Sequence, residues 1–258
     1  MGNPIGWCTK TWNPIIGCSH VSPACDHCYA ERMARRQVAM GNPNYAKVVG
    51  PDGKWNGKTT LVESKLNKPL HWRKPQRIFA CSMSDLFHES ADYNWIEHVF
   101  SVIDRSPQHT FLILTKRPKA MNTFLCCDSR TYRAWDVNPL SNVHLGVTAE
   151  NQEQWNLRVP WLLKTPAAKR FVSVEPMLGP VLTGYSLLNK THIDGVICGG
   201  ENGPGARPMH LDWVRSLRDQ CVAAGAEFYF KGFGAHNEQM QKKEGVCQIS
   251  AFSTGHVG

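Results

Sequence analysis

The chain has 258 residues, 42% of them hydrophobic, so it can bury a substantial core as one large domain or two small ones. It contains no internal repeat, low-complexity tract or membrane-length apolar run, which excludes repeat architectures and membrane spans and predicts a soluble, cytoplasmic protein. The formal net charge of +8 favours a polyanionic partner. Ten cysteines without a signal-peptide pattern at the amino end argue against a disulfide framework.

The first predicted strand, Pro14–Gly17, leads directly into a C-x6-C-x2-C motif formed by Cys18, Cys25 and Cys28. A helix is predicted immediately afterwards, over Tyr29–Ala39. Three thiolates without an obvious fourth ligand favour an iron-sulfur cluster that leaves one iron open.

Zinc is the alternative at this motif, because structural zinc is normally held by four protein ligands. Cys8, His20 and His27 are close enough in sequence to supply the fourth. Thiolate ligands suit both metals, so the spacing alone leaves a cluster and zinc equally open.

Residues 41–76 form a basic, aromatic insertion. Tyr45, Trp55 and Trp72 are interleaved with its cations, and its only acidic residues are Asp52 and Glu63. The cations are Lys47, Lys54, Lys58, Lys65, Lys68, Arg73 and Lys74. Cations that meet phosphates and rings that stack on bases indicate a nucleic-acid surface. A solvated insertion whose tryptophans pack locally explains the same pattern equally well.

Further along the chain, short apolar runs alternate with segments of helical periodicity, which predicts βα units with parallel strands. The predicted strands are Arg77–Cys81, Thr110–Leu114, Val143–Val147, Lys169–Val174, Ile193–Cys198 and Glu227–Phe230. The predicted helices are Tyr93–Arg105, Gln152–Leu163 and Leu211–Ala224. Asn151 and Asp212 are expected as helix N-caps, and Gly225 as a helix stop.

Polar or ionisable residues follow almost every predicted strand. After Cys18 these are Ser82, Ser84, Asp85, Thr115, Lys116, Arg117, Thr148, Glu150, Asn151, Ser173, Glu175, Glu201, Asn202 and Lys231. The carboxyl ends of parallel strands in a barrel meet at one face, where barrel enzymes carry their sites. A complete barrel needs about 250 residues, and the insertion uses part of the length, so we expect a partial barrel of six or seven strands.

Six segments, in order, closely resemble the phage-associated branch of the radical S-adenosylmethionine (SAM) superfamily, which is distantly similar to spore photoproduct lyase. They are TWNPIIGCSHVSPACDHCYAERMARR, SMSDLFHE, HTFLILTKRP, LGVTAEN, SVEPMLGP and GGENGPGARPM. The resemblance runs from about Thr11 to Gly234. It implies a single domain over residues 1–258, an α/β partial TIM-like barrel of radical SAM type, with a short tail at about 235–258.

Two positions depart from the usual patterns. The first cysteine gap is three residues longer than the usual C-x3-C-x2-C of the superfamily, and the branch shares this longer gap. Branch members typically read Phe-Lys-Gln-Trp-Gly near the end, where this chain has Phe230-Lys231-Gly232-Phe233-Gly234. The motif's lysine is therefore present here as Lys231, whereas the roles of the missing Gln and Trp are in doubt.

The resemblance implies that Cys18, Cys25 and Cys28 hold a four-iron, four-sulfur cluster whose open iron binds SAM. Cleavage of SAM there yields a 5'-deoxyadenosyl radical. His27 would lie beside the adenine, and Ser82, Ser84 and Asp85 would receive the methionine ammonium. Lys116 or Arg117 would bind the methionine carboxylate. The ribose hydroxyls would meet Thr148, Glu150 and Asn151, and the substrate would face Glu175, Glu201 and Lys231.

The expected substrate is DNA that carries an amino-acid-modified thymine, because phage members of the branch are implicated in thymine hypermodification. The enzyme would isomerise glycyl-thymine from nitrogen-linked to carbon-linked form, with the base outside the duplex. A reducing partner such as flavodoxin or ferredoxin would supply the electron. The alternatives are a radical enzyme of lesion repair or tRNA modification, and a non-catalytic, zinc-bearing nucleic-acid binding module.

Overall fold

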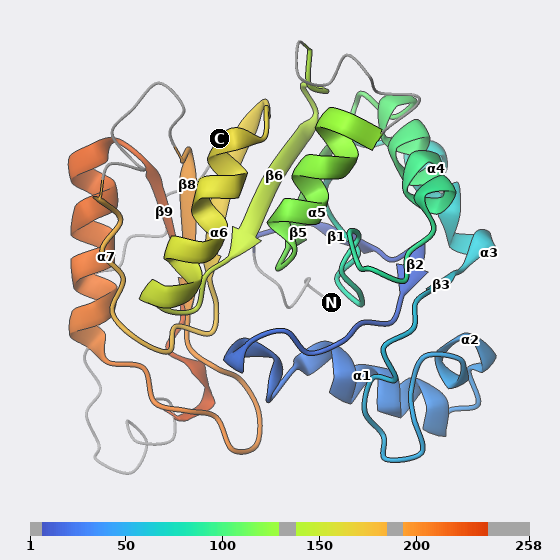
Figure 1. The fold of residues 1–258 in the computed structure, drawn as a ribbon, viewed down its shortest axis with the longest axis horizontal. Helices are drawn as coiled ribbons and strands as arrows, with labels where there is room; N and C mark the ends of the chain where they lie inside the picture. Colours follow the sequence, from blue (N-terminus) through green and yellow to red (C-terminus); the bar gives the residue numbers. More distant parts are fainter. Residues whose placement is uncertain (1–6, 129–137, 185–192, 237–258) are drawn as a thin grey trace.

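A seven-stranded parallel sheet curls into a half-barrel at the centre of the molecule (Figure 1). The computed structural model describes residues 7–128, 138–184 and 193–236. The strands lie side by side in chain order: β1 (Lys10–Trp12), β4 (Arg77–Ala80), β5 (Thr110–Thr115), β6 (Val143–Thr148), β7 (Lys169–Val174), β8 (Gly195–Gly199) and β9 (Glu227–Gly232). This mixed α/β fold is consistent with the expected partial TIM-like barrel.

Helices cover the convex face of the sheet. They are α4 (Tyr93–Asp104), α5 (Pro118–Thr123) with the π-helical turn Phe124–Asp128, α6 (Gln152–Lys164) and α7 (Leu211–Ala224). Their buried side chains, such as Phe100, Trp155 and Val214, pack with outward-facing strand residues in the main core. This packing follows the helical spacing of apolar residues in the sequence.

The concave face has a core of its own, to which no described helix contributes. It consists of Trp7, Cys8, Phe79, Leu112, Phe171 and Ile197. Trp7 and Cys8 come from the segment before β1, so the amino end of the chain fills part of the half-barrel. The ring of Phe171 lies so close to Gly146 on β6 that a Cβ atom there would be 2.4 Å from it. Glycine at this position lets the ring cross the strand.

The segment between β1 and β4 lies at the carboxyl end of the strands (Figure 1). It contains β2 (Ile15–Ile16), the 3-10 turn Pro23–Cys25, α1 (Tyr29–Ala39), α2 (Pro43–Ala46), β3 (Thr60–Leu61), α3 (Glu63–Leu66) and the 3-10 turn Lys68–His71. A small core of Ile16, Ala30, Ala34, Tyr45, Val48, Val62 and Met83 joins the insertion to α1.

Two local predictions are wrong. Ile15 and Ile16 do not form the first strand of the main sheet, which is β1, but pair antiparallel with β3. The apolar run is buried by the insertion rather than by the barrel, a distinction that hydrophobicity cannot make. Asp212 lies inside α7 and bonds Arg215, and His210 is the N-cap.

The remaining helix boundaries are close to those predicted. The α1 and α7 ranges are confirmed, and α4 and α6 differ from the prediction by one residue each. Asn151 caps α6, accepting a hydrogen bond from the Gln154 N–H at 2.9 Å. Gly225 ends α7 with a φ of 70°, in the left-handed region that favours glycine.

Within the ranges that the structure describes, none of the helices combines the length and the apolar character that a bilayer span requires. The predicted tail at about 235–258 lies outside the described residues, except for its first two.

Replacing Gly146 with Ala tests the packing of the concave core. The added methyl would meet the Phe171 ring at 2.4–2.6 Å, and overpacking of this kind typically destabilises a protein by about 1–3 kcal/mol. Urea denaturation should show this loss. Gly195→Ala is the matched control, since a Cβ on that strand glycine meets neighbours at ordinary contact distances of 3.5 Å and longer. Equal stability of the two variants would contradict the close packing of the Phe171 ring on Gly146.

Candidate functional site

The three cysteines of the motif lie on one loop at the carboxyl end of the half-barrel. This cysteine loop, residues 17–28, connects β2 to α1. It starts beside the end of β4, where the Gly17 N–H donates to the Met83 carbonyl at 3.1 Å. Cys25 is buried, whereas Cys18 and Cys28 are partly exposed, and all three thiols are free. The loop therefore presents three thiols over the end of the sheet.

Asp85, which follows β4, is held by donors from the protein. Its Oδ1 accepts from the Thr115 hydroxyl at 2.7 Å and from the Phe87 N–H at 3.1 Å. Its Oδ2 accepts from the Lys116 N–H at 2.9 Å and from Arg117 Nη1 at 3.3 Å. The carboxylate is almost fully buried, at 6% exposure. It thus joins the ends of β4 and β5 and orients Arg117.

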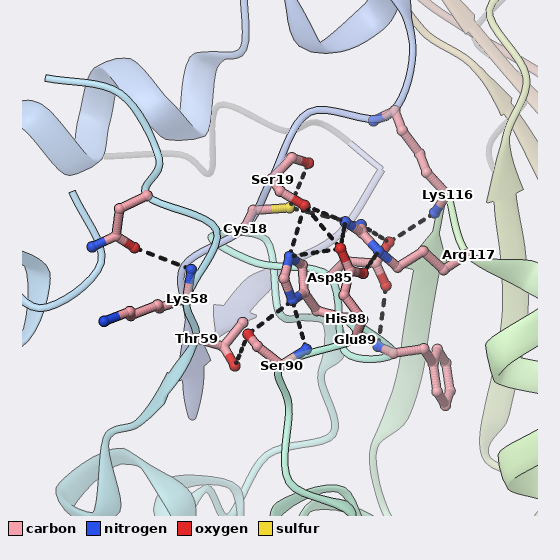
Figure 2. A network of polar contacts seen from close by, with 12 residues as sticks. Cys18, Ser19, Lys58, Thr59, Asp85, His88, Glu89, Ser90, Lys116 and Arg117 are labelled. Carbon is pink, nitrogen blue, oxygen red and sulfur yellow. Dashed lines mark hydrogen bonds and ion pairs between the residues drawn. The ribbon is translucent and has the colours of Figure 1, made fainter. Parts of the chain in front are cut away.

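Arg117 connects Asp85 to the cysteine loop (Figure 2). Its Nη2 donates to Ser19 Oγ at 2.7 Å, and its Nη1 lies 4.0 Å from Cys18 Sγ. Its Nε donates to Glu89 Oε2 at 2.5 Å. Burial would raise the pKa of Glu89, but the hydrogen bond from Arg117 outweighs it and lowers that pKa to about 2. The guanidinium is fully engaged by carboxylates and by the loop.

A buried histidine, His88, supports Ser19 from the other side. The Ser90 N–H donates to His88 Nδ1 at 3.1 Å, so the ring proton resides on Nε2, which donates to Ser19 Oγ at 2.9 Å. Burial and the charge of Arg117 lower the pKa of His88. The ring is therefore neutral near pH 7, and the same network reaches Thr59 of the insertion through the Ser90 hydroxyl (Figure 2).

Glu150, after β6, anchors the middle of the cysteine loop. It is fully buried; its Oε2 accepts from Arg158 Nη1 at 2.9 Å, and its Oε1 accepts from the Ala24 N–H at 3.3 Å. Burial raises the pKa of Glu150, but hydrogen bonds and the Arg158 charge outweigh it, so the pKa is lowered. Removing one partner of such a buried pair typically costs about 3–5 kcal/mol, because the other charge is left uncompensated.

Glu201, after β8, anchors the carboxyl end of the loop. It accepts hydrogen bonds from the Arg207 guanidinium and the Arg207 N–H, and it lies 2.9 Å from His27 Nδ1. Arg207 also donates to the Pro23 carbonyl at 2.8 Å and pairs with Asp26. Burial would raise the pKa of Glu201, but the bonds from Arg207 and His27 hold it at about 2.

Three strand-end carboxylates thus share one design. Asp85, Glu150 and Glu201 are each paired with an arginine, and each carboxylate or its arginine bonds the cysteine loop. The anchor points are spread along the loop, at Ser19, Ala24 and His27. Hydrogen bonds within the protein therefore hold the loop in place without a bound ligand.

Glu175 and Lys231 make a fourth ion pair that differs from these three. Glu175 follows β7 and Lys231 lies near the end of β9, with Nζ 2.5 Å from Oε1. Both side chains keep some solvent exposure, at 14% and 27%. In the described part of the chain, neither hydrogen bonds to the cysteine loop.

Ser82 and Ser84 lie beside the start of the loop, and their hydroxyls bond locally. Ser82 Oγ donates to Asn13 Oδ1 at 3.1 Å, and Ser84 Oγ donates to the Ile15 carbonyl at 3.0 Å. Thr148 is buried at the end of β6, and its carbonyl accepts from Arg158 at 2.8 Å. These residues lie at the predicted end of the sheet and stabilise its connections.

Lys116 differs from its neighbour Arg117. Its side chain extends away from Asp85 (Figure 2), and among the described residues its ammonium forms no ion pair. Its charge lowers the pKa of Cys18, so it is near that thiol. Burial and Asp85 act in the opposite direction and raise the pKa of Cys18 to about 12. The thiol is therefore protonated near pH 7 unless a metal displaces the proton.

Within residues 7–128, 138–184 and 193–236, no group of three or more His, Cys, Asp or Glu side chains is arranged to hold a metal ion. The two histidines considered as zinc ligands each meet a carboxylate: His20 lies 3.1 Å from Glu31, and His27 bonds Glu201. The thiols of Cys18, Cys25 and Cys28 are among the described side chains, so they too are not gathered around one point.

The insertion buries or half-buries its rings and exposes most of its cations, although Lys65 Nζ lies 5.9 Å from the centre of the Tyr45 ring. Tyr45 is buried at 4% exposure, and Trp55 and Trp72 are half-buried against the cores beneath them. Lys47, Lys54 and Lys58 are exposed. The rings are thus packed locally, whereas the three exposed lysines can meet an anionic partner.

Several residues of this site were not among those predicted. Arg158 is one of several polar residues of α6, and nothing in the sequence relates it to Glu150. The contact between Ser19 and His88 spans 69 positions. Ser19, His88 and Arg207 all fall inside segments that carry the family resemblance, and this is the signal that sequence reasoning could have used.

The fold and the site define the class of this protein. It is a parallel half-barrel with a three-cysteine loop anchored across its carboxyl end. A family model described as "Protein of unknown function (DUF5131)" matches residues 2–252, so the chain belongs to that family. No curated protein and no solved structure matches the chain.

Arg207→Met should loosen the cysteine loop, because it removes the bonds to Glu201 and to the Pro23 carbonyl. Hydrogen exchange of the backbone amides at residues 24–28 should accelerate by roughly ten-fold or more, since a hydrogen bond to a charged group contributes about 1.5–3 kcal/mol. Arg215→Met, which removes an exposed pair with Asp212, is the control and should leave the loop unchanged. Unaltered exchange in the Arg207 variant would show that the anchor is dispensable.

Proposed function

We propose that this protein is a radical SAM enzyme that isomerises an amino-acid-modified thymine in DNA. The observation that carries the proposal is the position of Cys18, Cys25 and Cys28 on one anchored loop over the carboxyl end of a parallel half-barrel. Active sites of parallel barrels lie at that end. The six sequence segments that resemble the phage-associated radical SAM branch all contribute to the same region.

Cys18, Cys25 and Cys28 supply the number and kind of ligands that a four-iron, four-sulfur cluster with one open iron requires. A single zinc ion requires its ligands to converge on one point, whereas each thiolate of a cluster binds a different iron. Separate thiols on one loop are therefore compatible with a cluster. Cys18, Cys25 and Cys28 would be its ligands, and the bound cluster would supply the electron that cleaves SAM to a 5'-deoxyadenosyl radical.

The surrounding residues divide the remaining tasks. Asp85 and Glu201 hold the loop through Arg117 and Arg207, and Glu150 bonds the Ala24 N–H directly, so these carboxylates position the thiols instead of contacting SAM. Arg117 is likewise committed to Glu89 and Ser19. Lys116, whose ammonium has no ion-pair partner in the described part of the chain, is the better candidate for the SAM carboxylate.

DNA is supported as the partner by the exposed lysines of the insertion, which lies at the same end of the half-barrel. Cations there would hold phosphates that flank an unstacked base.

In the proposed isomerisation, the bond from nitrogen to the thymine methylene breaks and a bond from that methylene to the glycyl α carbon forms. The hydrogen lost from the α carbon ends on the nitrogen, so composition and oxidation state are unchanged. The site would work in the cytoplasm, with flavodoxin or ferredoxin as reductant.

Anaerobic reconstitution with iron and sulfide tests the cluster. The wild-type protein should bind about four irons per chain, show the brown colour of an iron-sulfur protein and release 5'-deoxyadenosine from SAM on reduction. Cys25→Ala should lose most of the iron and all of the release. Cys221→Ala, which alters a buried cysteine of α7, should retain both. A colourless protein that binds zinc would overturn the radical SAM proposal.

Mass spectrometry of digested DNA tests the substrate. Single-stranded DNA containing nitrogen-linked glycyl-thymine, treated with reconstituted enzyme, SAM and reductant, should yield a nucleoside of the same mass and a different retention time. DNA with plain thymine should be unaltered. If SAM is cleaved and the glycyl-thymine is unaltered, whereas a dithymine lesion or tRNA is modified, the enzyme belongs to repair or to tRNA modification.

A further inference from the structure

Four carboxylates at the end of the half-barrel are paired with cations, but one of them has a different kind of partner. Asp85, Glu150 and Glu201 are paired with arginines, which grip a carboxylate with a rigid, planar fork. Glu175 is paired with Lys231, whose ammonium is a single charge on a flexible stem. A lysine pair opens and reforms more readily than an arginine fork.

The Glu175–Lys231 pair lies on the concave side, where a substrate would enter. On β9, Tyr229 packs on the concave core and Phe230 on the convex one, and a β-bulge then interrupts the alternation, because Cys198 pairs with Phe230 and Gly199 with Gly232. The face of Lys231 follows instead from Gly199, since a Cβ atom on this glycine would lie 3.3 Å from Lys231 Cβ. On β8, Ile197 belongs to the concave core, so Gly199 shares its face. The ion pair bridges β7 and β9 above Gly199.

The space under the pair exists because residue 199 is glycine. A Cβ atom there would lie 3.2 Å from Glu175 Oε1 and 3.3 Å from Lys231 Cβ, which is tighter than ordinary contact. The pair also lies on either side of the end of β8, which leads to Glu201 and its contact with His27 of the cysteine loop at 2.9 Å. It therefore faces the region that the three thiols border.

We propose that Glu175 and Lys231 bind the α-amino-acid group of the substrate, with Glu175 taking its ammonium and Lys231 its carboxylate. This inference rests on the proposed function and names the part of the modified base that the site recognises. The pair binds this group by opening, so that each of its charges exchanges one partner for another.

The charge balance selects this ligand. A ligand with only a positive or only a negative group would satisfy one member of the pair and leave the other unpaired at a site that is 14% and 27% exposed, which is unfavourable. A group that carries both charges keeps the site neutral. Glycyl-thymine has one carboxylate and one basic nitrogen before and after the isomerisation, so the same two residues can hold it throughout.

Fluorescence anisotropy with two single-stranded oligonucleotides tests the assignment. One carries nitrogen-linked glycyl-thymine, and the other carries aminomethyl-uracil at the same position, which keeps the basic nitrogen and lacks the carboxylate. Lys231→Met should weaken binding of the glycyl probe by roughly ten-fold or more, and it should not weaken the aminomethyl probe, which has no carboxylate for Lys231 to bind. Glu175→Gln should weaken both probes, because both contain the nitrogen.

The aminomethyl probe also reports that the Lys231 variant is folded and still binds DNA. The inference is overturned if both variants bind the glycyl probe like the wild type, or if Lys231→Met weakens both probes equally. It is likewise overturned if the variants weaken binding of SAM and spare the glycyl probe, since the pair would then hold the methionine group. Release of 5'-deoxyadenosine is measured separately, so a failure here is distinguishable from failure of the radical SAM proposal.

Discussion

The need to neutralise buried carboxylates is the constraint on which this structure depends. Asp85, Glu150 and Glu201 are placed at strand ends with little access to water, and each would be strongly destabilising without an arginine. Because the arginines or the carboxylates also bond the cysteine loop, the same interactions that make the charges tolerable fix the loop across the half-barrel. The ion pairs and hydrogen bonds that neutralise the buried carboxylates thus also position the thiols.

The half-barrel gives this loop a rigid base. Helices cover the convex face, while Trp7 and Phe171 help to fill the concave face from the opposite end. The concave core stops short of the carboxyl edge, where Glu175 and Lys231 lie. The site is therefore bordered by a packed core beneath and an anchored loop above. In the proposed function, these borders would keep a reactive intermediate from water.

The proposals assign the strand-end charges to two tasks. Three arginine-paired carboxylates position the thiols, and the lysine-paired carboxylate recognises the substrate. This division differs from the roles that the family resemblance implied, in which Asp85, Glu150 and Arg117 contact SAM. The difference arises because a side chain already saturated by protein donors, as Asp85 is with four, has little capacity left for a ligand.

The sequence by itself determined the parallel strands, the principal helices and the end of the sheet at which polar residues gather, because these follow from local periodicity and from chain order. It misplaced the first strand, since an apolar run looks alike whether the barrel or the insertion buries it. Only the tertiary structure decided which charges pair. Arg158 reaches Glu150, and Arg207 reaches Pro23 across 184 positions, through folding that no local pattern encodes. Pairing depends on distances in space, and these are set by the packing of the whole sheet.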